Sequence, residues 1–149
     1  MSNTAGPSSF ASATASLPAV AEPFVQLYRA FWTLESIPAS TLELCRLRQA
    51  QLHGSEVAWQ HREVELPSLQ REELRHWPQS NHFSDAERAC LSLAEVHAMD
   101  AQAISDAQAN AVKAHYGEVG LVALVQALGV FDTIVRLGLI WAVSSGEVA

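Results

Sequence analysis

Apolar residues recur every three to four positions along most of this chain, which is the spacing of one face of an α-helix. The clearest early example covers roughly residues 23–34. Its apolar stripe consists of Phe24, Leu27, Tyr28, Phe31 and Trp32. The sequence has no long run in which apolar and polar residues alternate, and no Asn-Gly hairpin turn. The pattern therefore predicts an all-α fold in a single domain.

Polar and special residues predict where the first two helices begin and end. Pro23 suits the first turn of a helix, because a missing amide hydrogen costs nothing there. Ser40 and Glu43 have the spacing of a capping box, which would begin a second helix. Gly54 follows the last apolar position of that helix and is a typical C-terminal stop.

Five further helices are expected after Gly54, which gives about seven in all. Ser84 and Glu87 form a second candidate capping box, and Gly117 is expected to end a helix. The last helix is apolar on most sides, and a kink is expected near Gly129. The expected ranges are about 56–65, 68–77, 82–100, 103–115 and 119–143.

A chain of 149 residues is long enough for one domain with a single hydrophobic core. Residues 1–18 are rich in Ser and Ala, and they lack the basic start and the apolar centre of a signal peptide. This composition predicts a disordered tail, followed by a helical domain over residues 19–149.

Charge and hydropathy narrow the class of partner. With 9 basic and 16 acidic residues, the chain has a formal net charge of −7 and would repel a nucleic-acid backbone. The apolar segment 119–143 contains Asp132 and Arg136, which are costly inside a membrane and can pair along a helix. Burial inside a globule or between subunits explains the segment better. We therefore expect a cytoplasmic homo-oligomer (a dimer, trimer or hexamer) that binds neither nucleic acid nor a membrane.

Residues that often carry redox or metal chemistry occur without the necessary spacing. Cys45 and Cys90 lie far apart inside apolar helical patterns, so we interpret them as small buried residues and expect no disulfide framework. The six histidines form neither His-x-x-x-His nor another pair with a third ligand at a suitable distance. We expect no metal and no cofactor.

Three segments together resemble the carboxymuconolactone decarboxylase superfamily, which includes the alkyl hydroperoxidase D-like proteins. They are "LELCRLRQAQLHG" (42–54), "HFSDAERACLSLAE" (82–95) and "FDTIVRLG" (131–138), and they occur in the order and spacing of that family. The likeness covers roughly residues 20–145. It implies the all-helical alkyl hydroperoxidase D-like fold.

The peroxidase branch of that family carries Cys-x-x-Cys directly after the glycine of the first segment. Ser55 and Ala58 occupy these two positions here. Peroxide reduction through a disulfide needs a thiolate pair, which serine and alanine cannot supply. The substitutions disfavour alkyl hydroperoxidase or peroxiredoxin-type activity, although family labelling would suggest it.

A second branch of the family reads approximately Ser-Glu-x-x-Trp-x-Gln-His at this place. "SEVAWQHR" (55–62) is similar to it, with one residue missing between Trp59 and Gln60. The resemblance implies cofactor-free acid–base chemistry on a small organic acid or lactone, or no chemistry at all. Removing one residue from a continuous helix turns all later side chains by about 100°, which would direct His61 away from the pocket.

Glu43 and His61 are the candidate catalytic residues. A carboxylate in an apolar pocket has a raised pKa that suits a general base, but Glu43 is also the third position of the expected capping box. His61 can transfer protons near neutral pH, or it can simply hydrogen-bond a helix end.

Three further residues are candidates for substrate binding. Arg48 can hold a carboxylate with two hydrogen bonds, or it can lie in solvent or between subunits. Ser55 can donate to a ligand, although a helix cap is the more common role for such a residue. Trp59 is expected in the pocket wall or in the core. The alternative to an enzyme is a non-catalytic scaffold or ligand-binding member of the same fold.

Overall fold

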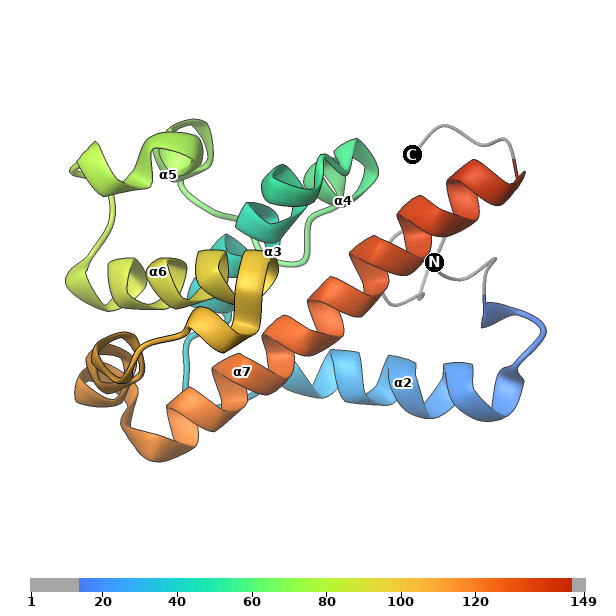
Figure 1. The fold of residues 1–149 in the computed structure, drawn as a ribbon, viewed down its shortest axis with the longest axis horizontal. Helices are drawn as coiled ribbons and strands as arrows, with labels where there is room; N and C mark the ends of the chain where they lie inside the picture. Colours follow the sequence, from blue (N-terminus) through green and yellow to red (C-terminus); the bar gives the residue numbers. More distant parts are fainter. Residues whose placement is uncertain (1–13, 146–149) are drawn as a thin grey trace.

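The all-α prediction is confirmed. A computed structural model describes residues 14–145, and side chains are described for residues 14–141. Within this part of the chain, helices are joined by turns and short loops, and there are no strands (Figure 1). The helices are α2 (Pro18–Phe31), α3 (Ala39–His53), α4 (Glu56–Gln60), α5 (Ser68–Glu73), the 3-10 helix η1 (Leu74–Gln79), α6 (Asp85–Asp100), the 3-10 helix η2 (Ala101–Ala103) and α7 (Asp106–Ser145).

The tail predicted for residues 1–18 lies largely outside the described residues, which begin at Thr14. Helix α2 begins at Pro18 and contains Pro23 within it, so the expected start at Pro23 was wrong. Pro18 takes the first-turn position, where a missing amide hydrogen costs nothing.

Helix α3 lies at the centre of the fold and packs against α4, η1, α6 and α7. All seven residues from Thr41 to Leu47 are buried, so the helix has no solvent face over two turns. A helix that is buried all round needs neighbours on every side. The one-sided amphipathic pattern typical of a surface helix is therefore absent from α3.

Several predicted helix ends are confirmed. Gly54 caps α3 with a φ of 69°, a left-handed conformation that glycine adopts without steric cost. Ser84 and Glu87 form the capping box of α6, with both reciprocal hydrogen bonds present. By contrast, the capping box predicted at Ser40 and Glu43 is wrong, because α3 begins at Ala39 and Glu43 is turned into the core.

The segment after α3 is less helical than expected. Helix α4 ends at Gln60, five residues before the predicted end at residue 65. Helix α5 passes into η1, which includes Pro78, so proline does not terminate this helical stretch where expected. A 3-10 helix tolerates proline here because few of its backbone amides are needed as donors.

Helix α7 crosses the molecule diagonally (Figure 1). Its backbone leaves the helical conformation at Gly117, with φ 69° and ψ −176°, as the sequence predicted, whereas no such departure occurs at the predicted kink near Gly129. The stretch Asp106–Trp141 is long and apolar enough to cross a membrane. Leu124, Leu128 and Phe131 on it are nevertheless buried, which a central helix of a globule also shows.

Aromatic side chains hold α2 against α7. Trp32 stacks on Phe131, with ring centroids 5.4 Å apart, and Tyr28 meets both rings edge-on. Such pairs contribute about 0.5–1.5 kcal/mol beyond the apolar area that they bury. This contact places the hydroxyl of Tyr28 beside the loop that follows α4.

Candidate functional site

Glu43 and Arg46 form a buried ion pair on α3. The Arg46 Nε donates to Glu43 Oε1 over 2.6 Å. Only 4% of the Arg46 side chain and none of the Glu43 side chain is exposed. A buried charge pair is stable only when its remaining donors and acceptors are also satisfied.

The backbone after α4 satisfies those groups. Arg46 donates to the carbonyl oxygens of Ala58 and His61, at 2.9 and 2.6 Å. Glu43 Oε2 accepts from the backbone amides of Glu63 and Val64, at 2.6 and 2.7 Å. The pair therefore binds the end of α4 and the following loop to α3. Since both oxygens of Glu43 are engaged and the residue is fully buried, its carboxylate has no solvent-facing position for a ligand.

His61 is placed by this loop, because α4 has already ended. Its backbone is extended, with φ −68° and ψ 140°, so the expected rotation along a continuous helix does not apply. The His61 Nε2 lies 2.6 Å from Glu63 Oε1, which also accepts from the Tyr28 hydroxyl at 2.7 Å. The structure thus connects His61 to Glu43 through Arg46 and the loop backbone, with Glu63 as its side-chain partner.

Glu63 is a site residue that the sequence did not indicate. Burial raises the pKa of its carboxyl, but hydrogen bonds from His61 and Tyr28, together with the charges of His61 and Arg46, lower it more, so the net pKa is below the usual value. Burial raises the pKa of Tyr28 above its usual range. In the sequence, "HREVE" resembles an ordinary charged loop, and Tyr28 is 35 residues away. No local pattern could have identified the pair.

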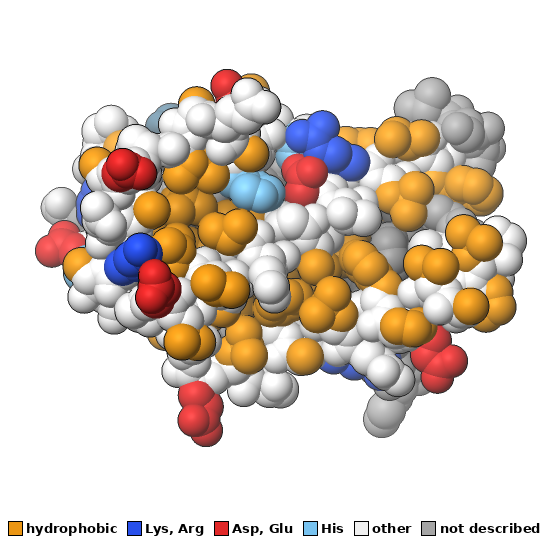
Figure 2. Space-filling model, turned by 60° about the horizontal axis from the view of Figure 1, so that its bottom comes forward, with side chains coloured by type: hydrophobic (Ala, Val, Ile, Leu, Met, Phe, Trp, Pro, Cys, Tyr) orange, Lys and Arg blue, Asp and Glu red, His pale blue; other side chains and the backbone are white. Residues whose placement is uncertain are grey.

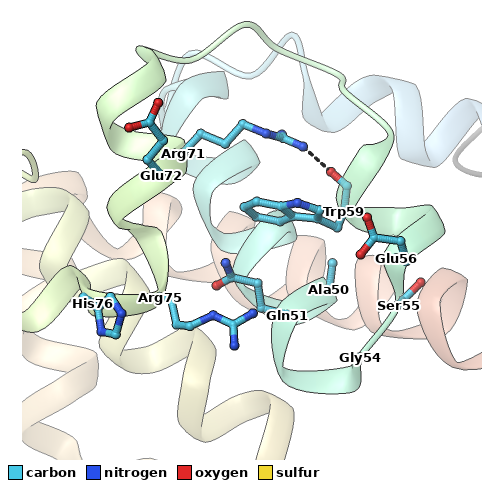
Figure 3. Close-up of a pocket in the computed structure, with 10 residues that line it drawn as sticks. All are labelled: Ala50, Gln51, Gly54, Ser55, Glu56, Trp59, Arg71, Glu72, Arg75 and His76. Carbon is cyan, nitrogen blue, oxygen red and sulfur yellow. Dashed lines mark hydrogen bonds between the residues drawn. The ribbon is translucent and has the colours of Figure 1, made fainter.

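A cavity of about 450 Å³ lies between the end of α3, helix α4 and the α5–η1 segment (Figure 3). Two of the predicted site residues, Ser55 and Trp59, line it, whereas Glu43, His61 and Arg48 do not. The other lining residues are Ala50, Gln51, Gly54, Glu56, Arg71, Glu72, Arg75 and His76.

Trp59 forms a flat wall of this cavity and is fixed by Arg71. The Arg71 guanidinium carbon lies 4.3 Å from the ring centroid, and its Nη2 donates to the Trp59 carbonyl oxygen over 2.6 Å. A cation over an indole face is an attractive arrangement. Burial lowers the pKa of Arg71, and the positive charge of Arg62 adds to that effect.

Arg48 and Ser55 have structural partners. Arg48 donates to Glu95 Oε1 at 2.7 Å and to Gln51 Oε1 at 2.9 Å, so it holds Gln51 at the edge of the cavity. Ser55 is the N-cap of α4 and accepts from the Ala58 amide, as expected of a capping residue. Its own hydroxyl hydrogen remains available at the cavity wall.

The cysteines Cys45 and Cys90 are free and buried. Burial raises the pKa of the Cys45 thiol well above its usual value and that of Cys90 to about 12. Thiolate, the reactive form, is therefore scarce at neutral pH.

In the part of the chain that the structure describes, no group of three or more His, Cys, Asp or Glu side chains could hold a metal ion.

Neither a model of a known protein family nor a curated protein sequence matches the chain.

Proposed function

We propose that this protein binds a small organic acid in the cavity beside Trp59, as a non-catalytic member of the carboxymuconolactone decarboxylase-like proteins. The observation that carries this proposal is the separation of the cavity from Glu43, the expected general base. The cavity volume lies within the range of about 300–1,000 Å³ typical of ligand sites. Arg75, Gln51 and Ser55 offer hydrogen-bond donors from three different elements around it.

Ligand-observed NMR of the full chain with acetate, succinate, benzoate and γ-butyrolactone tests the proposal. We expect saturation transfer to at least one carboxylate, weakened in an Arg75→Gln variant, and no product signals after prolonged incubation. Arg62→Gln is the matched control, because Arg62 is exposed and does not line the cavity. The absence of transfer to all four compounds would reject ligand binding, and product formation would reject the non-catalytic assignment.

Acid–base chemistry remains the second candidate, and the observation in its favour is the contact between His61 and Glu63. A carboxylate that accepts a hydrogen bond from one ring nitrogen of a histidine fixes the orientation of the ring. The His61 side chain is 30% exposed, so the ring is partly accessible from solvent. In this case Glu63, and not Glu43, would be the carboxylate that acts together with His61. Conversion of a lactone or acid by the wild type but not by His61→Gln would favour this candidate.

Thiol peroxidase activity has the least support. Both thiols are buried with raised pKa values, and Ser55 and Ala58 stand at the positions of the family's redox pair. A peroxide-consumption assay with Cys45→Ser and Cys90→Ser decides the matter. Activity in the wild type that either variant loses would reverse this conclusion.

A cytoplasmic homo-oligomer remains part of the proposal. Figure 2 shows hydrophobic side chains spread widely over the face that looks out from the lower side of Figure 1, where α2 and α7 lie. Among the described side chains of α7, the exposed valines are Val119, Val122 and Val125. Apolar side chains that gather on one exposed face are a feature of interfaces between proteins.

A further inference from the structure

The two faces of the Trp59 indole have different surroundings. Arg71 covers one face. Figure 3 shows Ala50, Gln51 and Arg75 on the other side of the ring, where they border the cavity. One face is therefore occupied by a cation, and the other side of the ring borders the cavity and lies near the buried Ala50. A flat apolar wall of this kind favours a flat partner, because offset stacking brings the two ring systems into contact over their whole area.

Two uncharged side chains of the cavity wall, Gln51 and Ser55, offer donors. Gln51 Oε1 already accepts from Arg48, which leaves the amide hydrogens of Gln51 for a ligand. The Ser55 oxygen already accepts from the Ala58 amide, which leaves its hydroxyl hydrogen. Such donors match the oxygens of an anion.

Among the four charged side chains around the cavity, Arg75 is the one placed to meet an anion. It forms no hydrogen bond or ion pair with the described part of the chain, and it extends toward Gln51 in Figure 3. Arg71 is engaged with Trp59, and Glu56 accepts from the Gln60 amide at 2.6 Å. Glu72 extends away from Trp59 and Arg75 (Figure 3).

From this arrangement we infer that the ligand is a planar aromatic carboxylate. Its ring stacks on the cavity side of Trp59, and its carboxylate accepts from Arg75 and Gln51, which lie close together in Figure 3. The inference rests on the proposed binding of a small organic acid and specifies its chemical class. Both halves of the ligand are required: a flat ring for the indole, and an anionic end for the donors.

Three probes separate these requirements: benzoate, cyclohexanecarboxylate and benzyl alcohol. Cyclohexanecarboxylate keeps the charge but is not flat, and benzyl alcohol keeps the ring but is neutral. In protein-observed NMR titrations of the full chain at pH 7, we expect benzoate to bind about three- to ten-fold more tightly than cyclohexanecarboxylate. We expect a preference of about ten-fold or more over benzyl alcohol. These comparisons use the wild type, so they do not depend on the folding of a variant.

Two variants assign the preferences to residues. Arg75→Gln should weaken both acids about ten-fold, whereas Arg62→Gln should leave them unchanged. Trp59→Leu should remove the preference for benzoate over cyclohexanecarboxylate. Equal affinity for these two acids in the wild type, with both weakened by Arg75→Gln, would overturn the aromatic ligand but leave organic-acid binding intact. If neither acid binds, both proposals fail. Both also fail if the ligand changes the chemical shifts only of residues outside the cavity.

Discussion

Glu43 and Arg46 fix the segment that follows α4. Their side chains bind four backbone groups in the segment after α4, contributed by Ala58, His61, Glu63 and Val64. Each of these groups would otherwise need water or another partner. The pair thus stabilises the loop that carries His61, in addition to neutralising its own buried charges.

Arg46→Met tests this role. The substitution leaves Glu43 buried without its cation, and the carbonyl oxygens of Ala58 and His61 lose their hydrogen-bond donor. We therefore expect the free energy of unfolding to fall by about 3–5 kcal/mol. Urea denaturation provides the measurement, with Arg62→Met, at an exposed site, as the control that stays within about 0.5 kcal/mol. Adding Glu43→Gln to Arg46→Met should recover part of the loss, because the unpaired charge is then gone. A loss below about 1 kcal/mol for Arg46→Met would contradict the structural role.

The lowered pKa of Glu63 predicts a dependence of stability on acid. A carboxyl with a lower pKa in the folded than in the unfolded state contributes stability that is present above the unfolded value of 4.5 and is lost as pH falls through the folded value. We therefore expect Glu63→Gln to destabilise the protein at pH 7 and to differ less from the wild type at pH 3. Urea midpoints across this range give the comparison. The exposed Glu65→Gln should show no such convergence, and a constant difference for Glu63→Gln would refute the prediction.

At the level of helices, local signals and distant contacts decide different boundaries. The stops at Gly54 and Gly117 and the capping box at Ser84 depend on groups within a few residues, so the sequence predicts them correctly. The end of α4 at Gln60 coincides with hydrogen bonds from Arg46 and to Glu43, which lie 12 to 21 residues away. A local pattern contains no information about such partners.

Gly117 and Gly129 on α7 form a matched pair for testing the break in this helix. The φ of 69° and ψ of −176° at Gly117 belong to a region that residues with a Cβ rarely adopt, so Gly117→Ala should cost about 1–3 kcal/mol. Gly129 is helical, and a Cβ added there would meet nothing within 4 Å, so Gly129→Ala should stabilise by up to about 1 kcal/mol. Thermal and urea unfolding measure both. The same sign for the two variants would show that α7 is continuous through Gly117 in solution.

For the molecule as a whole, the exposed apolar surface of α7 has the clearest physical consequence. Val119, Val122 and Val125 are 72%, 51% and 39% exposed, although the helix that carries them is also part of the core. Such a helix is buried on one side and exposed to solvent on the other. Contact between its exposed side and another apolar surface removes both from water and lowers the free energy.

We therefore expect the wild type to be a homo-oligomer at micromolar concentration and Val122→Lys to shift it toward the monomer. A lysine at the centre of an apolar interface must be desolvated without a partner, which weakens association by several kcal/mol. Analytical ultracentrifugation measures the mass of both proteins. Thr133→Lys, at another exposed position of α7, is the control for added charge. A monomeric wild type would rule out the interface.

The sequence by itself determined the helical class and those helix ends that depend on neighbouring residues. It also indicated a cap as the more common role for Ser55, beside ligand binding, and it predicted the buried character of both cysteines, because composition and local spacing carry that information. Only the tertiary structure decided which polar residues meet. It turned Glu43 into the core, joined Glu63 to Tyr28 and His61, and placed Arg71 and Arg75 beside Trp59. Hydrogen bonds and cavities arise from residues that are distant in sequence, and their positions follow from packing.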